Sequence, residues 1–181
     1  MLKNTSSGYG LLAIVLHWLM ALAIFGMFGL GLYMVTLNFY HPWYHSALEA
    51  HKSAGVLVAL VLVIRFGWRQ INTSPAGLGN RTENMVAHLV HMLLYVLMAA
   101  MIVSGYLIST ADGRAIEVFG WFDVPSLLIR EGMEEVAGEV HEWLAWSLMG
   151  LVALHAAAAL KHHVLVKDNT LRRMLRPGVQ D

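Results

Sequence analysis

The sequence predicts an all-α integral membrane protein, a four-helix bundle with both termini in the cytoplasm. Hydrophobic residues make up 57% of the 181 residues, and the chain carries only 12 basic and 12 acidic side chains. The apolar residues gather in four stretches long enough to cross a bilayer, whose hydrocarbon core is about 30 Å thick and takes about 20 apolar residues per helix. These three observations favour one membrane domain over residues 1–181, in contact with lipid.

Composition also excludes several kinds of site. The chain has no cysteine, which removes disulfides, thiolate ligands, iron–sulfur clusters and covalently attached c-type haem. The formal net charge is zero, so nothing indicates binding of nucleic acid. The ten histidines are unusual, because a histidine within a membrane span must face protein, a cofactor or water and not lipid.

The first predicted helix covers about residues 9–36. Residues 1–8 are polar, and the apolar stretch that follows is too long for the core of a signal peptide, so we expect a retained membrane helix. His17 lies about two turns from its start. The aromatic connector 37–47, LNFYHPWYHSA, is typical of the membrane interface.

The second predicted helix covers about residues 48–69 and carries His51 in its first turn. It ends with side chains that anchor a helix at the interface: Arg65, Trp68 and Arg69.

The third predicted helix covers about residues 82–109 and follows a loop with proline and glycine, with Thr82 as its expected N-cap. The connector 111–138 is the longest, and we expect a short amphipathic helix within it on the membrane surface. The fourth helix covers about 137–165, and a polar, basic tail follows over 166–181.

The distribution of positive charge predicts the orientation of the four spans. Cytoplasmic segments of membrane proteins carry the excess of Lys and Arg. Nine basic residues fall on the side of the termini: Lys3, Arg65, Arg69, Arg81, Lys161, Lys167, Arg172, Arg173 and Arg176. Three fall on the other side: Lys52, Arg114 and Arg130.

Four histidines match in depth under this topology. His141 and His155 lie about 21 Å apart along the fourth helix and diverge by only about 40° around it. His17 and His155 lie at a similar depth from the cytoplasmic side, and His51 and His141 lie near the outer ends of their helices. Two histidines from facing helices give a six-coordinate b-type haem, which carries electrons because its iron has no open position. The pattern predicts two haem b groups, with His17 and His155 as ligands of the inner iron and His51 and His141 as ligands of the outer iron.

A different class of protein remains open. A lone histidine in a membrane helix is more often a hydrogen-bonded or pore-lining group than a metal ligand, and a non-redox carrier of metal ions or protons would use the histidines as a relay. Such a protein would be colourless after purification, whereas a di-haem protein would be red.

His162 and Lys161 are candidates for a second kind of site. His162 lies within about 20° of the helix face of His155, at the cytoplasmic interface. A quinone head group at that position needs hydrogen bonds and protons, which a histidine can supply.

The roles of the other four histidines on the third helix and in the first connector stay open. His88 and His91 stand three residues apart on the third helix and suit haem propionates, a proton relay, a metal, or only a polar stripe. His41 and His45 have the spacing of a metal site on a helix, but Pro42 argues against a regular helix across them.

Five motifs together resemble the bacterial cytochrome b561 family, which includes the superoxide oxidases, over about residues 9–176. They are LHW around His17, EAHKSAG around His51, AHLVHMLLY around His88 and His91, VHEWLA around His141, and LHAAAALKHHVLVKDNTLRRM from Leu154. The resemblance implies a four-helix di-haem b cytochrome of the bacterial inner membrane that passes electrons between the periplasmic side and the quinone pool. It also implies the same four histidine ligands, and His162 as the leading quinone contact.

Two activities follow from the resemblance and stay open. One is that of a superoxide:ubiquinone oxidoreductase. Superoxide is an anion, yet the outer loops carry nine carboxylates against three cations, so Lys52 beside His51 is the candidate positive entrance. The other is that of a membrane cytochrome subunit, since an acidic rim equally suits a basic periplasmic redox protein.

Overall fold

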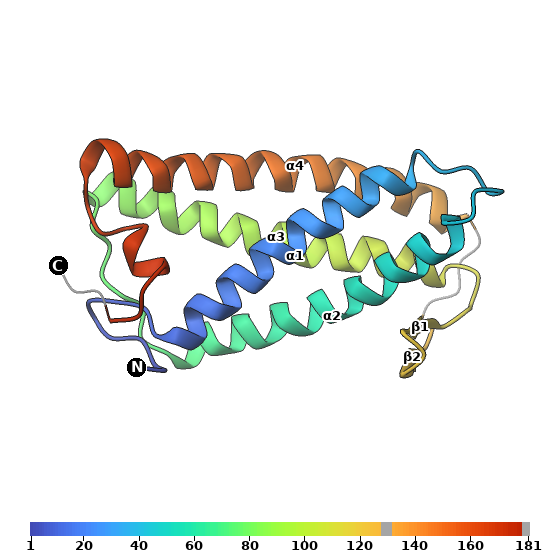
Figure 1. The fold of residues 1–181 in the computed structure, drawn as a ribbon, viewed down its shortest axis with the longest axis horizontal. Helices are drawn as coiled ribbons and strands as arrows, with labels where there is room; N and C mark the ends of the chain where they lie inside the picture. Colours follow the sequence, from blue (N-terminus) through green and yellow to red (C-terminus); the bar gives the residue numbers. More distant parts are fainter. Residues whose placement is uncertain (128–131, 179–181) are drawn as a thin grey trace. The chain divides into compact units, whose positions relative to one another are not determined.

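The computed structural model describes residues 1–127 and 132–178, and within them four long helices dominate (Figure 1). The helices are α1 (Leu11–Met34), α2 (Tyr44–Ile71), α3 (Arg81–Thr110) and α4 (Met133–Lys161). Each is long and apolar enough to cross a membrane, which confirms the predicted all-α, four-span fold class. Arg130 and Glu131, which enter the charge counts above, lie outside the described residues.

The connection between α3 and α4 differs from expectation. Its described part contains an antiparallel hairpin, β1 (Ile116–Val118) paired with β2 (Phe122–Val124), and not the amphipathic surface helix predicted within 111–138. Phe119 and Gly120 have φ of 50° and 71°, and the Trp121 amide donates to the Val118 carbonyl over 2.9 Å. Two consecutive residues with positive φ form a tight turn between the two strands. A right-handed helix cannot continue through such residues, so this segment is a hairpin.

The start of α3 also differs from expectation. Asn80 is the capping residue, because its Oδ1 accepts from the Glu83 amide over 2.9 Å and the Glu83 carboxylate accepts from the Asn80 amide over 3.1 Å. This reciprocal pair is a capping box. The predicted N-cap Thr82 is therefore wrong, and Thr82 lies within the first turn of α3.

The chain divides into two compact units, each built from parts of all four helices. The first unit contains residues Met1–Met20, Val61–Leu97 and Ser147–Asp181, and the second contains Ala21–Leu60 and Met98–Trp146. Each histidine pair predicted above falls entirely within one unit: His17 with His155 in the first, and His51 with His141 in the second.

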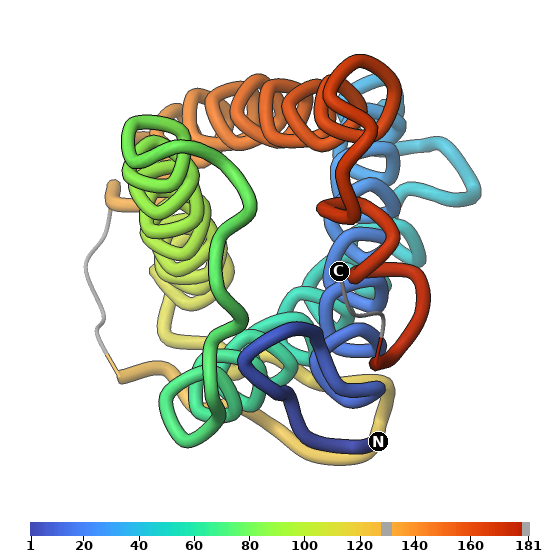
Figure 2. Tube along the Cα trace, turned by 90° about the vertical axis from the view of Figure 1, so that its left-hand side faces the viewer, coloured from blue at the N-terminus to red at the C-terminus, as the bar shows by residue number. Residues whose placement is uncertain are grey.

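In the first unit the C-terminal tail returns to the start of α1. After α4 the chain continues as a π-helix, His162–Val166, and a short 3-10 helix, Arg172–Met174. The Trp18 indole donates to the Met174 carbonyl over 2.7 Å, and Arg173, only 5% exposed, donates to the Ala76 carbonyl over 2.8 Å. The red tail accordingly runs beside the blue start of the chain in Figure 2. The tail is basic, as expected, and these hydrogen bonds hold it against Trp18 of α1 and Ala76 of the α2–α3 loop.

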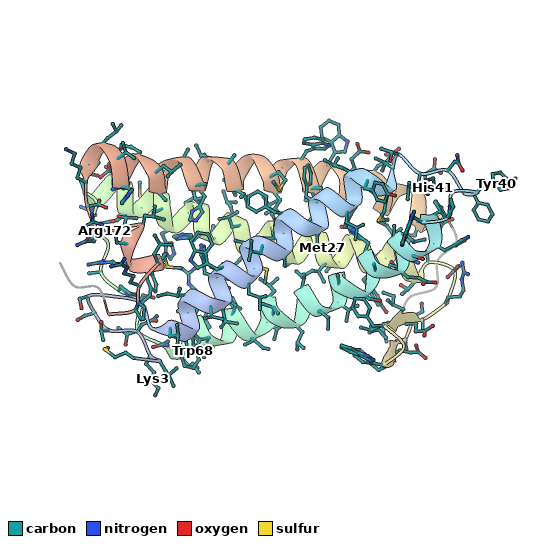
Figure 3. The ribbon with its side chains drawn as sticks, in the orientation of Figure 1. Lys3, Met27, Tyr40, His41, Trp68 and Arg172 are labelled. Atoms are coloured by element: carbon teal, nitrogen blue, oxygen red, sulfur yellow. The ribbon has the colours of Figure 1, made fainter. Side chains whose placement is uncertain are left out.

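In the second unit Ser53 fastens the hairpin to α2. Its side chain is 2% exposed, donates to the Glu117 carbonyl over 3.1 Å and accepts from the Phe119 amide over 3.2 Å. Val118, on the same hairpin, is fully buried. Tyr40 projects from the α1–α2 connection (Figure 3), and its side chain and that of Trp121 are exposed.

Candidate functional site

The structure places the two predicted histidine pairs at nearly the same separation. In the first unit the ring centroids of His17 on α1 and His155 on α4 lie 6.2 Å apart, with 62° between the ring planes. In the second unit those of His51 on α2 and His141 on α4 lie 6.3 Å apart, with 72° between the planes. All four side chains are half-buried.

This separation fits a metal ion held between two imidazoles. A metal–nitrogen bond is about 2 Å, and the ring nitrogen lies about 1 Å from the ring centroid, so two imidazoles on opposite sides of one metal have centroids about 6 Å apart. Direct ring–ring contact does not require this spacing, since ring centroids in contact range over about 4.5–7 Å. Both pairs therefore fit the bis-histidine haem sites predicted from the sequence.

Ser104 on α3 determines which nitrogen of His141 carries the proton. The Ser104 hydroxyl donates its single proton to the Met101 carbonyl over 3.0 Å and lies 2.9 Å from His141 Nδ1. Because a hydroxyl has only one proton, Nδ1–H of His141 donates to Ser104 Oγ. The lone pair of His141 is thereby assigned to Nε2, the nitrogen left for a metal.

Glycines lie against the His51 and His141 rings. A Cβ atom on Gly31 would lie 3.6 Å from His51 Cε1, and one on Gly105 would lie 3.2 Å from His141 Cε1, closer than most Cβ contacts. His51 Nδ1 is buried and has no hydrogen-bond partner among the described residues. A side chain at Gly105 would therefore press against the His141 ring, whereas a Cβ atom at Gly31 would meet the His51 ring at an ordinary contact distance.

His17 has a different neighbour, Arg65 on α2. A guanidinium nitrogen of Arg65 lies 2.9 Å from His17 Nδ1. A guanidinium can only donate, so Nδ1 accepts and the neutral ring carries its proton on Nε2. Ligation through Nε2 requires that nitrogen to lose its proton, so this pair fits haem by its spacing but must exchange the Arg65 hydrogen bond when haem binds.

Arg65 brings an uncompensated charge to the first unit. It is half-buried, and both it and Arg69 stack on the Tyr95 ring, at 5.6 and 5.3 Å from the centroid. Among the described residues no carboxylate forms an ion pair with Arg65. A charge within a membrane helix is costly, and such residues usually serve a function.

His91 joins the first pair, and His88 does not. The His91 ring centroid lies 5.1 Å from that of His155, whereas His88 is exposed. The two residues, which the spacing places on neighbouring positions of one face, therefore have different environments.

His162 forms a hydrogen bond with Asp168. Lys167, with φ of 61°, reverses the chain after the π-helix, so the Asp168 carboxylate reaches His162 Nδ1 over 2.6 Å. Burial alone would raise the pKa of Asp168, but hydrogen bonds from Thr170 and from His162 lower it below its ordinary value. The neighbouring His163 has a buried Nδ1 with no partner among the described residues.

The other candidate residues are already engaged. The Lys161 ammonium pairs with Glu83 over 3.1 Å. Lys52 is half-buried, and its charge contributes, after the hydrogen bonds from Arg114, to lowering the pKa of the exposed Asp112. His41 Nδ1 accepts from the Trp43 amide over 3.2 Å, and the described residues contain no cluster of three or more metal-ligating side chains.

Three site residues were not singled out from the sequence in these roles: Arg65, Ser104 and Asp168. Arg65 and Ser104 stand out as polar residues within apolar runs, which was the available signal. Asp168 carried no such signal, since only the chain reversal at Lys167 brings it to His162.

Comparison with known proteins gives a consistent result. A family model described as prokaryotic cytochrome b561 matches residues 8–177. The chain is 49% identical to cytochrome b561 homolog 2 of Escherichia coli (strain K12) over 181 residues, covering 98% of this chain and 96% of the relative. It is 28% identical to the probable superoxide oxidase CybB of Yersinia pestis over 170 residues, covering 92% and 95%. It is also 28% identical to cytochrome b561 homolog 1 of E. coli over 131 residues, covering 70% and 73%.

Proposed function

This chain belongs to the prokaryotic cytochrome b561 family of haem-binding membrane electron-transfer proteins, and we propose that it is a di-haem b cytochrome linking a periplasmic electron donor to the quinone pool. One observation carries the proposal: in each of the two histidine pairs the ring centroids lie at nearly the same distance, 6.2 Å in one pair and 6.3 Å in the other. One such pair could be ordinary packing. Two pairs with the same spacing on membrane-spanning helices support two haem sites.

The four histidines have one role in this proposal, which is to hold and orient the haems. His17 and His155 hold one, and His51 and His141 hold the other. Haem b held by these histidines would supply one-electron exchange. Ser104 supports this role, because it fixes the tautomer in which His141 Nε2 is free to bind.

His162 and Asp168 serve quinone reduction in this proposal. Reduction of a quinone to a quinol consumes two electrons and two protons. Asp168 accepts from Nδ1 of His162, which leaves Nε2 for the quinone. When the ring is protonated on both nitrogens, it can give its Nε2 proton to a quinone oxygen and then take up a proton from water. The buried Nδ1 of the half-buried His163, which has no partner among the described residues, supports a ligand that forms hydrogen bonds here, and Lys161 lies two residues before it in the sequence.

The orientation follows the distribution of basic residues. The protein lies in a bacterial inner membrane with both termini on the cytoplasmic side. His162 is then at the cytoplasmic interface, so the protons for the quinone come from that side. The direction of transfer is from the periplasm to the quinone.

Two donors suit the periplasmic side. Superoxide oxidation coupled to ubiquinone reduction is supported by the similarity to a probable superoxide oxidase. A basic periplasmic redox protein is supported by the acidic outer loops, which carry more carboxylates than basic side chains. Stopped-flow mixing with superoxide separates them: rapid haem reduction identifies superoxide as the donor, and no reduction of a two-haem protein points to the protein partner.

Haem content tests the function itself. The purified protein should contain two haem b per chain by the pyridine haemochrome assay. His51→Ala and His141→Ala should each remove the same one of the two haems, and His17→Ala and His155→Ala should each remove the other. His88→Ala, at an exposed histidine, is the matched control and should retain both. A folded but colourless wild-type protein would instead identify a non-redox carrier.

A further inference from the structure

We propose that Arg65 and Ser104 give the two histidine pairs different electron affinities, so that an electron is held more tightly at the His17/His155 pair than at the His51/His141 pair. The inference rests on the proposed di-haem function. It assigns tuning roles to two residues that do not bind the metal, and it gives electron transfer a direction.

Arg65 places a positive charge beside the His17/His155 pair. Its guanidinium lies 2.9 Å from the His17 ring, and among the described residues it has no carboxylate partner. The Arg65 guanidinium also stacks on the Tyr95 ring, and this contact holds it near the pair even if its hydrogen bond to His17 is exchanged for another acceptor. Reduction adds one negative charge, which a cation in a low-dielectric environment stabilises. Arg69, stacked on the same ring, adds to the effect.

Ser104 forms a hydrogen bond with the His141 ring of the other pair. His141 Nδ1–H donates to a neutral hydroxyl, which raises the basicity of the ring as a ligand and favours the oxidised metal. Among the described residues, no basic side chain is hydrogen-bonded to the His51 or His141 ring or stacked on it. The second unit therefore lacks a counterpart of Arg65 among the described residues near its pair.

The two effects act in the same direction. Arg65 raises the reduction potential of a haem at His17/His155, and Ser104 lowers that of a haem at His51/His141. Electrons that arrive at the second pair then pass to the first pair, which shares its unit with His162 and Asp168.

Spectroelectrochemical titration of the purified holoprotein tests the inference. The His51→Ala variant, which retains only the His17/His155 haem, identifies the potential of each site. In Arg65→Gln the higher potential should fall while the other stays unchanged, and Arg65→Lys, which keeps the charge, should stay close to the wild type. In Ser104→Ala the lower potential should rise.

The outcomes separate this inference from the proposed function. Two haems with potentials unaffected by Arg65→Gln would overturn the tuning role and leave the di-haem function intact. So would a wild-type protein in which the His51/His141 haem has the higher potential. A colourless wild type would overturn both. If Arg65→Gln does not retain haem, Ser104→Ala decides: a rise in only the lower potential supports the inference, and no change overturns it.

Discussion

Ser104 Oγ lies 2.9 Å from His141 Nδ1, and its own proton is committed to the Met101 carbonyl. Removal of the hydroxyl in Ser104→Ala frees the His141 ring to rotate or change tautomer. Loss of such a supporting hydrogen bond typically costs about 10-fold to 100-fold in affinity for the metal group. We expect a weakening of about this size at the His51/His141 site, measured by haemin titration of the apoprotein.

Ser109→Ala is the control for this prediction. Its hydroxyl donates to the Gly105 carbonyl on the same helix over 2.8 Å, and it has no hydrogen bond to a histidine among the described residues. Equal haem affinity in the two variants would contradict the role of Ser104.

Gly105 is expected to tolerate no large side chain. A Cβ atom there would lie 3.2 Å from His141 Cε1, and the further atoms of Gly105→Leu would displace the ring. Overpacking of this kind costs about 1–3 kcal/mol, and here it should also remove the haem of that pair. Gly150→Ala is the control, because nothing lies within 4 Å of its Cβ position, and it should retain both haems. Haemochrome assays on the two variants give the answer.

Asp168 should make stability depend on pH at the acid end. Its folded-state pKa lies below the ordinary value of 3.8, so its contribution is present above that value and is lost as the pH falls through the folded pKa. Asp168→Asn should therefore lower the free energy of unfolding at neutral pH by about 1–2 kcal/mol and flatten its decline below about pH 4. Thermal unfolding in detergent, followed by circular dichroism over a pH series, measures both.

Asp112→Asn is the matched control for Asp168. The pKa of Asp112 is also lowered, by Arg114, but both side chains are exposed. An exposed pair contributes little to stability. A larger effect at Asp112 than at Asp168 would argue against a stabilising contact between Asp168 and His162.

Ser53 should hold the hairpin to α2. In Ser53→Ala the Phe119 amide loses its acceptor, which costs about 1–3 kcal/mol where no water replaces it. Hydrogen exchange at Phe119 should accelerate, while exchange in the middle of α2 stays slow. Ser46→Ala, at an exposed position of the same helix, should leave both rates unchanged. Unaltered exchange at Phe119 in Ser53→Ala would show that the hairpin is held by its apolar contacts alone.

The sequence predicted the four spans because their signal is local. Twenty or so consecutive apolar residues identify a membrane helix without any knowledge of its neighbours. The depth of the histidines along consecutive, alternating spans also predicted that His17 lies beside His155 and His51 beside His141, which the ring distances confirm.

The remaining features depend on long-range contacts or on single dihedral angles. The hairpin strands are three residues each, too short for a periodic pattern, and the turn depends on positive φ at Phe119, which is rare outside glycine. Arg65 meets His17 across two helices, and Ser104 meets His141 likewise. No spacing along one helix could predict which polar residue faces which histidine.

The composition of the two units has a consequence for biosynthesis. All of the second unit lies within residues 21–146, so every residue of this unit, its histidine pair included, is synthesised before Ser147. The first unit needs residues on both sides of the second, including the Met174 carbonyl that receives the Trp18 indole. The unit around His17 and His155 can therefore be completed only after all residues of the unit around His51 and His141 have been synthesised.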